Sequence, residues 1–418
     1  MKTKIIVPDE LEIIPTQPTE LLVISDIHLS AHSTKASRNV ERVIGDRIKT
    51  LGKLSSAIVV LNGDIFELWA GQKPSVNKAL QGHPKLTKSL QEFGKGAKHQ
   101  VIMVVGNHDG KLGWSETEQQ VLIKNFNAQI CFSLSIKLSN KANAKRILFE
   151  HGHMLDSENA FEDPRDPHDK PFGQYIVQRA LPMVQSTQGS LLTGLNHIAE
   201  PHKFAKFVAS RLMYREVFNR LWWLIIPLAV TFALRVIIGY DVFTFTGFSY
   251  SEVQRIVLYT ELAVVVNVGV ILFAIVIIVQ RVLSRAKTVP GTGAGEGHNY
   301  EARKKASNLI DQGKTIGFIT GHTHKPAIVE IKDGFFANSG CGVEMIYASQ
   351  AHFGLPNTYI SLNQLSWLEL SLTKNAGSVV LWQMSEDNHK LTKLERMVTK
   401  KSQFGKALHK SHEHNFEY

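Results

Sequence analysis

Short apolar runs recur along the first third of the chain, and each of them ends in polar residues. Between Leu21 and His153 these runs read LLVIS, AIVVLN, VIMVVG and RILFE, with helix-compatible segments between them. Continuous runs of Val, Ile and Leu of this length are typical of strands that are buried on both faces. Strands that alternate with helices predict an α/β sandwich, whose chemistry lies just past the carboxyl ends of its strands.

The pattern changes after His153. A polar loop and mixed helical sequence lead to two long apolar stretches, 221–239 and 257–280, and a Gly-rich linker follows them. The α/β pattern then resumes at the run TIGFIT, and the chain closes in a segment rich in Lys and His. We therefore predict six segments: core residues 1–155, a helical cap or membrane-proximal insertion over 156–220, a two-helix transmembrane hairpin over 221–280, a linker and helix over 281–314, the second part of the core over 315–386, and a basic tail over 387–418.

Five short motifs of Asp, Asn, Gly and His directly follow apolar runs. Imidazole nitrogens suit transition metals and carboxylate and amide oxygens suit harder ions, so this mixture indicates Mn, Fe or Zn. One such motif alone is usually a turn, whereas five of them in this order indicate a site. The motifs are Asp26-Ile-His28, Gly63-Asp64, Gly106-Asn107-His108-Asp109, His151-Gly-His153 and Gly321-His322-Thr-His324.

The cysteines take no part in these motifs, which argues against a structural zinc site. Cys131 and Cys341 are also too few for a disulfide framework, so we expect a reducing compartment. The first residues contain no apolar stretch long enough for a signal peptide.

The predicted ligands divide into two sets around one shared carboxylate. Two neighbouring ions need an anionic bridge, for which Asp64 is the candidate. His108 is not needed as a ligand, so it is free to stabilise or protonate the oxygen that departs from phosphorus. One ion is then expected on Asp26, His28 and His324, and the other on Asn107, His151 and His322.

The series DIH, GD, GNHD, HGH and GHTH resembles the calcineurin-like metallophosphoesterase superfamily over residues 21–155 and 315–345. The resemblance implies a four-layer α/β sandwich, the same ligand assignments, and hydrolysis of phosphomonoesters, phosphodiesters or pyrophosphates. Within the superfamily, GDIFELW followed by Gly resembles the branch that contains UDP-2,3-diacylglucosamine diphosphatase. That branch implies a peripheral membrane enzyme that uses manganese. We therefore expect two divalent ions, manganese first, with Fe or Zn as the alternatives that the ligand types allow.

The chain departs from two patterns of the superfamily. Protein Ser/Thr phosphatases carry an Asp-Arg pair where this chain has Glu67 and Leu68, so a phosphoprotein substrate is not expected. The diacylglucosamine branch has Arg and Asp where this chain has His108 and His153. These departures leave the substrate open.

Each of the two long apolar stretches is about long enough to cross the ~30 Å hydrocarbon core of a bilayer. Basic residues flank the outer ends of both stretches and the connection between them is slightly acidic, so the ends and the catalytic core are expected on the cytoplasmic side. Arg235 and Glu261 lie at matching depths and either pair with each other or snorkel to the interface. The alternative is that the hairpin packs as a buried core or dimer element of a soluble protein.

Smaller signals concern the substrate and other partners. Arg165 could grip a second phosphate, although charged loops are usually only solvated, and His153 is a second candidate substrate contact. The net charge of +10 and the basic end of the chain fit anionic lipid better than nucleic acid, because no basic strand is interleaved with aromatic residues.

Together these features predict a membrane-inserted phosphohydrolase that acts on a lipid-linked phosphate or pyrophosphate, such as a nucleotide-activated glycolipid. Two alternatives stay open. The first is a phosphodiesterase that acts on a soluble nucleotide and uses the hairpin only as an anchor. The second is a catalytically inactive membrane scaffold.

Overall fold

The structure is a computed structural model, and the account below covers the residues that it describes. These are residues 5–139, 144–180, 204–217, 223, 225–239, 250–285, 299–388, 390–401 and 404–418.

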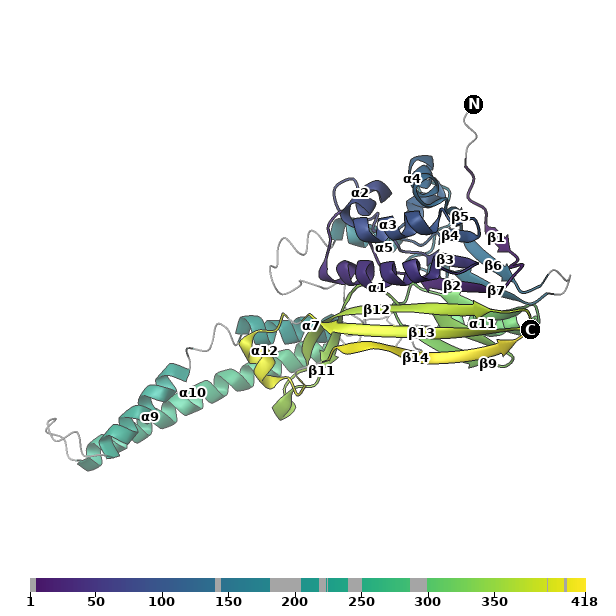
Figure 1. Cartoon of the computed structure of the whole chain (residues 1–418). Helices are drawn as coiled ribbons and strands as arrows, with labels where there is room; N and C mark the ends of the chain where they lie inside the picture. The colour runs from purple at the N-terminus through teal and green to yellow at the C-terminus, as the bar shows by residue number, and fades with distance from the viewer. Residues whose placement is uncertain are drawn as a thin grey trace.

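The larger of two β-sheets contains strands from both the first and the last part of the chain (Figure 1). Its strands run in the order β14-β13-β12-β2-β3-β4-β5, and β11 pairs with β12 beside that path. The strands β2 to β5 are parallel, whereas β12, β13 and β14 are antiparallel to their neighbours. The strands are β2 Thr19–Ile24, β3 Ala57–Asn62, β4 His99–Val104, β5 Gln129–Cys131, β11 Glu344–Ser349, β12 Thr358–Leu372, β13 Ala376–Asp387 and β14 Lys406–Glu417.

The smaller sheet has the order β1-β6-β7-β8-β10-β9 in the described residues. It combines strands from both sides of the insertion, because β7 pairs in parallel with β8. This pairing brings the fourth and fifth motifs to the same edge of the sheet. The strands are β1 Glu10–Ile13, β6 Ser133–Lys137, β7 Arg146–Glu150, β8 Thr315–Thr320, β9 Ala327–Ile331 and β10 Gly334–Asn338.

Helices cover the outer faces of both sheets. One apolar cluster fills the space between the sheets, a second lies between the larger sheet and α1, α3 and α4, and a third packs α11 on the smaller sheet. This order of layers confirms the predicted α/β sandwich. The helices are α1 Lys35–Leu51, α2 Val76–Gly82, α3 Pro84–Phe93, α4 Glu116–Phe126, α5 Phe172–Tyr175, α7 Phe204–Arg211, α9 Ile225–Gly239, α10 Tyr250–Arg285, α11 Tyr300–Asp311 and α12 Lys393–Val398.

Helix α1 shows how the sequence produces this packing. Thr34 caps its first turn, because its side chain accepts the N–H of Ser37 at 3.0 Å. Val40, Ile44 and Ile48 then recur at every fourth position and are fully buried. A stripe of this kind holds one face of the helix on the sheet.

The end of the chain corrects one prediction. The segment 387–418, expected as a basic tail, contains α12 and the edge strand β14, which pairs with β13. The end of this strand is anchored by Phe416, which is 5% exposed. Its ring centroid lies 5.1 Å from that of Phe335. The other side chains of the strand are mainly polar, so its composition concealed it.

Helices α9 and α10 pack against each other and project from the body as a rod (Figure 1). Within α10, Ser251–Ile271 is long and apolar enough to cross a membrane, and none of its apolar window is buried in the chain. It is the one such helix in the described ranges, since α9 has only 15 residues. A helical hairpin is therefore present with one candidate span. The side chain of Arg235 lies outside the described part, so its predicted pairing with Glu261 is not addressed.

The predicted cap, 156–220, is described in two pieces. Residues 156–171 form a loop that leads into α5 and the π-helix η3, Ile176–Ala180. The second piece holds α7 and the π-helix η7, Leu212–Val217, and α7 contacts both α10 and β12. The base of the rod is therefore connected to the larger sheet.

Candidate dinuclear metal centre

The five motifs meet where their strands end, and the backbone there adopts an uncommon conformation. Five of the predicted ligands have positive φ angles: Asp26 at 51°, His28 at 45°, Asp64 at 52°, His322 at 65° and His324 at 56°. Residues other than Gly rarely adopt this left-handed conformation, and functional sites are where it accumulates. The turns therefore aim these side chains inward at a cost in backbone energy.

Two glycines of the motifs allow the close approach of the ligands. A Cβ atom on Gly63, whose φ is 85°, would lie 2.3 Å from Nδ1 of His151. A Cβ atom on Gly106 would lie 2.3 Å from Oδ1 of Asp64. A side chain at either position would displace a predicted ligand, which explains why Gly precedes the ligand in these motifs.

The residues of the first predicted ligand set lie together. Ligand atoms of Asp26, His28 and His324 lie within 4.8 Å of one another. Nε2 of His324 is 3.2 Å from Oδ1 of Asp26. The other carboxylate oxygen, Oδ2, accepts the backbone N–H of His322 at 2.9 Å, so it is held in place by the fifth motif.

The second predicted set converges beside the first. Ligand atoms of Asp64, His151 and His322 also lie within 4.8 Å of one another. Nε2 of His151 is 3.3 Å from Oδ2 of Asp64 and 3.2 Å from Oδ1 of Asn107. Asp64 also faces the first set, because its Oδ2 is 3.9 Å from Nε2 of His28. The carboxylate of Asp64 thus lies between the two sets, as a bridging ligand must.

Two of the predicted histidine ligands each use one ring nitrogen for a hydrogen bond to a group outside the ligand set. Nδ1 of His151 donates to the carbonyl oxygen of Asn62 at 3.0 Å, which leaves Nε2 for the cluster. Nε2 of His322 donates to Oδ2 of Asp156 at 3.0 Å, which leaves Nδ1. Partners of this type fix the tautomer and the ring orientation of metal-binding histidines.

His108 lies at the edge of the cluster, and three contacts fix its position. Its Nδ1 is 2.8 Å from Oε2 of Glu67, its ring stacks on Trp69 with centroids 4.0 Å apart, and its backbone N–H donates to Oδ1 of Asp64 at 2.8 Å. Burial alone would lower the pKa of His108, but the carboxylates of Glu67 and Asp64 raise this pKa to about 9. With Nδ1 bound to Glu67, Nε2 is the nitrogen that remains to serve a substrate.

The chemistry of this donor set fits divalent cations. Asp26 and Asp64 are 0% and 2% exposed, and no Lys or Arg in the described ranges pairs with either of them. Apart from the imidazole of His324 at 3.2 Å, the buried Oδ1 of Asp26 has no hydrogen-bond partner among the described residues, and the buried Nε2 of His28 has none there either. Buried carboxylates need compensating charge, and the convergent oxygen and imidazole ligands are of the type that holds Mn, Fe or Zn.

The two predicted substrate contacts are placed differently. His153 lies beside the cluster, with its ring 5.4 Å from that of His151, but it is only 6% exposed. Arg165 is engaged elsewhere: its guanidinium donates to the carbonyl of Val7 at 2.8 Å and to Asp9 at 2.6 Å. Neither position favours a direct contact with a phosphate.

Several residues of the site were missed in the sequence. In the sequence Glu67 stands out only as a departure from the Ser/Thr phosphatase pattern, yet its carboxylate holds His108 and lies 3.4 Å from Nδ1 of His28. Asp109 accepts backbone N–H groups of Gly106 at 2.6 Å and Ile65 at 2.8 Å, so it ties two motif loops together. Its position in the third motif was the available signal, whereas nothing in the sequence pairs Glu67 with His108.

A family model for the calcineurin-like phosphoesterases matches residues 19–219 of the chain. Over this region the chain is identified as a calcineurin-like phosphoesterase. The match supports a metal-dependent phosphoesterase and covers the first four motifs. His322 and His324 lie beyond the matched region, and it is the pairing of β7 with β8 that brings this fifth motif to the phosphoesterase site.

No curated protein shows significant sequence similarity to the phosphoesterase. Among solved structures, a Vps29 variant from Entamoeba histolytica is 12% identical, with 89% of this chain and 99% of that one covered and a TM-score of 0.30. A predicted phosphoesterase from Streptococcus pneumoniae is 10% identical over 94% and 100%, with a TM-score of 0.26. GAP50 of Plasmodium, the anchor in the inner membrane complex, is 12% identical over 90% and 91%, with a TM-score of 0.35. At such TM-scores none of these likenesses assigns a property to this chain.

Proposed function

We propose that the phosphoesterase binds two divalent ions, manganese first and Fe or Zn as alternatives, and hydrolyses a phosphoester or pyrophosphate bond of a lipid-linked substrate at a membrane surface. The observation that carries the hydrolytic part is the convergence of two neighbouring three-residue groups, Asp26, His28 and His324 in one, and Asp64, His151 and His322 in the other. Asp26, His28 and His324 would hold one ion, and Asn107, His151 and His322 the other, with Asp64 shared between them.

The reaction follows from this arrangement. Bound divalent ions supply a nucleophile from water at neutral pH and offset negative charge on the phosphoryl oxygens. The water oxygen forms a bond to phosphorus while the bond from phosphorus to the leaving oxygen breaks in line with it. The leaving oxygen takes up a proton, or leaves as an anion when it is a good leaving group.

His108 is suited to assist that departure. Glu67 fixes its ring through Nδ1 and Trp69 supports its face, so Nε2 is held at the edge of the cluster. An imidazolium at this position donates a proton from Nε2 to the departing oxygen, and Glu67 keeps it charged until the transfer.

The membrane part of the proposal is supported by the surface of the rod. Large apolar side chains of α10 are half exposed or more, among them Leu262 at 58%, Val270 at 61% and Phe273 at 67%. Monomeric soluble proteins rarely expose an apolar surface of this extent. This exposure supports a membrane environment for the helix, because a bilayer would cover these apolar side chains without a second protein.

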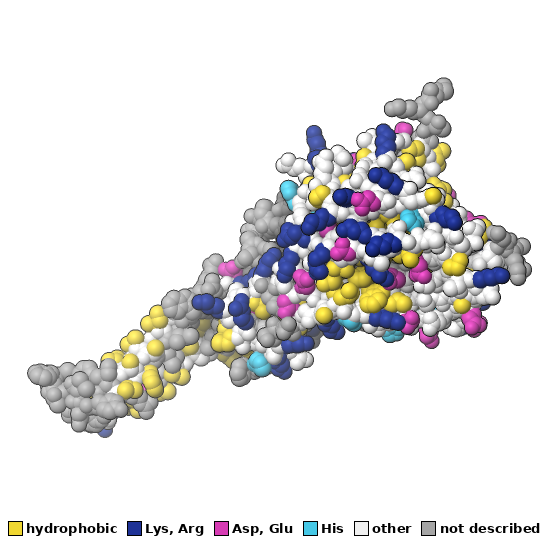
Figure 2. Space-filling view, viewed as in Figure 1, with side chains coloured by type: hydrophobic (Ala, Val, Ile, Leu, Met, Phe, Trp, Pro, Cys, Tyr) yellow, Lys and Arg dark blue, Asp and Glu magenta, His cyan; other side chains and the backbone are white. Residues whose placement is uncertain are grey.

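Basic side chains near the base of the rod favour an anionic surface. Figure 2 shows Lys and Arg gathered on the body over the part from which the rod leaves. The helix α12, which packs against η7, carries Lys393 and Arg396, and Lys400 follows it. We propose on this basis that the body rests on anionic headgroups, with two spans and a cytoplasmic body as the sequence predicts. Since α9 covers 15 residues, a second span would need residues outside that helix.

The membrane proposal predicts the outcome of an alkaline carbonate extraction. Wild-type protein should stay in the membrane pellet. Val266→Arg with Val270→Arg should shift it to the supernatant, because each charge at the centre of a span costs about 2.5–3.5 kcal/mol. Both side chains are more than half exposed, so no core contact is lost. The matched control is Leu54→Arg on the body, which is 42% exposed. Release of the wild-type protein would contradict membrane insertion.

Hydrolysis and substrate class are tested on purified protein. With Mn²⁺ supplied, a chromogenic phosphodiester should be hydrolysed, and chelation should stop the reaction. Detergent-solubilised lipid pyrophosphates should then compete more strongly than soluble nucleotides. Absence of turnover with Mn, Zn and Fe would contradict the function, whereas a preference for nucleotides would contradict only the lipid substrate.

A further inference from the structure

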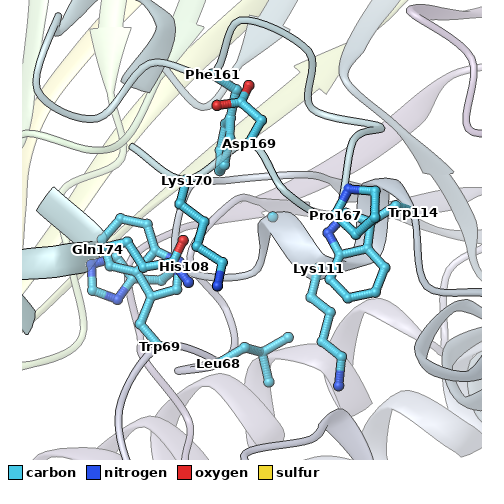
Figure 3. Close-up of a pocket in the computed structure, with 11 residues that line it drawn as sticks. Leu68, Trp69, His108, Lys111, Trp114, Phe161, Pro167, Asp169, Lys170 and Gln174 are labelled. Carbon is cyan, nitrogen blue, oxygen red and sulfur yellow. The ribbon is translucent and has the colours of Figure 1, made fainter. Parts of the chain in front are cut away.

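A pocket lies beside the metal centre and shares His108 with it (Figure 3). Its walls come from the loop after Asp64, from the short helix η1, Gly110–Gly113, and from the loop between His153 and α5. The His108 ring therefore lies next to both the metal cluster and this pocket. The lining side chains that matter below are Trp69, His108, Lys111, Trp114, Phe161 and Lys170.

Aromatic and apolar groups form much of the wall. Trp69 and Phe161 are 6% and 9% exposed and are fixed by their neighbours, since Trp69 stacks on His108 and Phe161 contacts the ring of His153. Trp114 is 39% exposed and lies across the pocket from His108 in Figure 3. An exposed indole at the mouth of a pocket is a surface on which a ring or an acyl group packs.

The two lysines of the pocket differ in their charge partners. Lys111 is paired with Glu118 at 2.6 Å, so its charge is already compensated. No acidic side chain among the described residues forms an ion pair with Lys170, whose neighbour Asp169 instead accepts the N–H of Asp163 at 2.7 Å. Figure 3 shows the Lys170 side chain extending into the space between His108 and Trp114. Lys170 is thus the ammonium group of the pocket without an ion-pair partner among the described residues, while the one lining carboxylate, Asp169, is engaged by a backbone N–H.

The loop that carries Lys170 is fastened to the body, so the pocket is preformed. Arg165 holds the loop through Val7 and Asp9, and its guanidinium lies 4.7 Å from the centre of the Phe132 ring. The loop also approaches η1 closely, because a Cβ atom on Gly113 would lie 2.3 Å from the carbonyl oxygen of Pro164. Arg165 is therefore a positioning residue of this loop.

We propose that this pocket binds the leaving group of the substrate, and that the leaving group carries a negative charge of its own beside an aromatic or apolar body. This inference rests on the proposed function. If His108 serves the departing oxygen, the group attached to that oxygen extends away from the metals and past His108. There it meets the wall formed by Trp114 and the ammonium group of Lys170. Charge-assisted contacts of this type favour a phosphate or carboxylate over a neutral group.

The test uses two methyl aryl phosphodiesters that differ only in the departing phenol. One phenol carries a para carboxylate, and the other a para carboxamide of nearly the same shape. With Mn²⁺ supplied, the full-length protein should show a KM roughly three- to tenfold lower for the carboxylate ester, as expected for one partly exposed charged contact.

Lys170→Gln should remove this preference by raising KM for the carboxylate ester while leaving the carboxamide ester unchanged. Trp114→Ala should raise KM for both esters. Lys88→Gln is the matched control, because Lys88 is an exposed residue of α3 outside the pocket, with 76% of its side chain accessible. Equal KM values for the two esters in wild type and in Lys170→Gln would overturn the inference while the hydrolytic function stands. Turnover of neither ester would instead count against the function itself.

The negative charge has two candidate sources, a nucleotide and a lipid phosphate. A nucleoside 5′-monophosphate and a single-chain lipid phosphate, kept below its micelle concentration, are therefore compared as product inhibitors. The inhibitor whose potency falls roughly three- to tenfold in Lys170→Gln identifies the source. Absence of a Lys170-dependent effect with both inhibitors would contradict a charged leaving group.

Discussion

Replacement of Asp64 by Asn should reduce metal-dependent hydrolysis by about a thousandfold or more. The neutral amide keeps the shape of the side chain but removes the bridging charge between the two ligand sets. Loss of the charge stabilisation that metal ions provide costs several kcal/mol, and every 1.36 kcal/mol is tenfold in rate. Asn is chosen over Ala because Asp64 has a φ of 52°, which Asn tolerates better than other residues. The measurement is kcat/KM on a chromogenic phosphodiester, together with bound metal per chain.

The matched control for this variant is Asp46→Asn. Asp46 lies on α1, where its side chain is 71% exposed and forms an i,i+3 pair with Lys49. The control should keep wild-type turnover and metal content. If turnover in Asp64→Asn stays within about tenfold of wild type, a bridging role for Asp64 is contradicted.

Replacement of His108 by Gln should lower kcat by about a hundred- to ten-thousandfold for substrates with alkyl leaving groups, the usual range for general acid catalysis. The loss should be far smaller for a p-nitrophenyl ester, because nitrophenolate departs without a proton. Metal content should not change, since the hydrogen bond from His108 to Asp64 comes from the backbone N–H. This dependence on the leaving group distinguishes proton donation from a structural effect.

His412→Gln is the control for the loss of an imidazole. His412 is exposed on the edge strand β14, where it lies opposite Leu381 of β13 in the strand register. The control should behave as wild type with both classes of substrate. Equal losses with alkyl and nitrophenyl esters in His108→Gln would contradict proton donation by His108.

The sequence predicted the part of the fold that repeats a simple pattern. Runs such as AIVVLN form the fully buried strand β3, and the motif that follows it delivers Asp64 to the sheet edge. The proximity of the motif residues could be predicted because each motif is short and directly follows its strand. The fifth motif can be recognised in the same way although it lies far along the chain from the first. The two are linked by the hydrogen bond from the backbone N–H of His322 to Asp26.

The remainder depends on contacts between side chains that no local pattern records. Glu67 orients His108 across two loops, and Asp156 orients His322 from a loop that reads as solvated. The strand β14 was missed because an exposed edge strand lacks the apolar alternation of a buried one. Arg165 is a candidate phosphate contact in the sequence because of its charge alone, whereas its partners Val7 and Asp9 lie far away along the chain.

The central claim is that this chain uses two metal ions, and metal reconstitution tests it most directly. The full-length protein is stripped with a chelator, Mn²⁺ is returned in steps, and bound metal per chain is measured alongside hydrolysis of the phosphodiester. We expect saturation at two ions per chain, with turnover that appears only as the second ion binds. Turnover that survives the chelator, or full turnover at one ion per chain, would contradict a dinuclear centre.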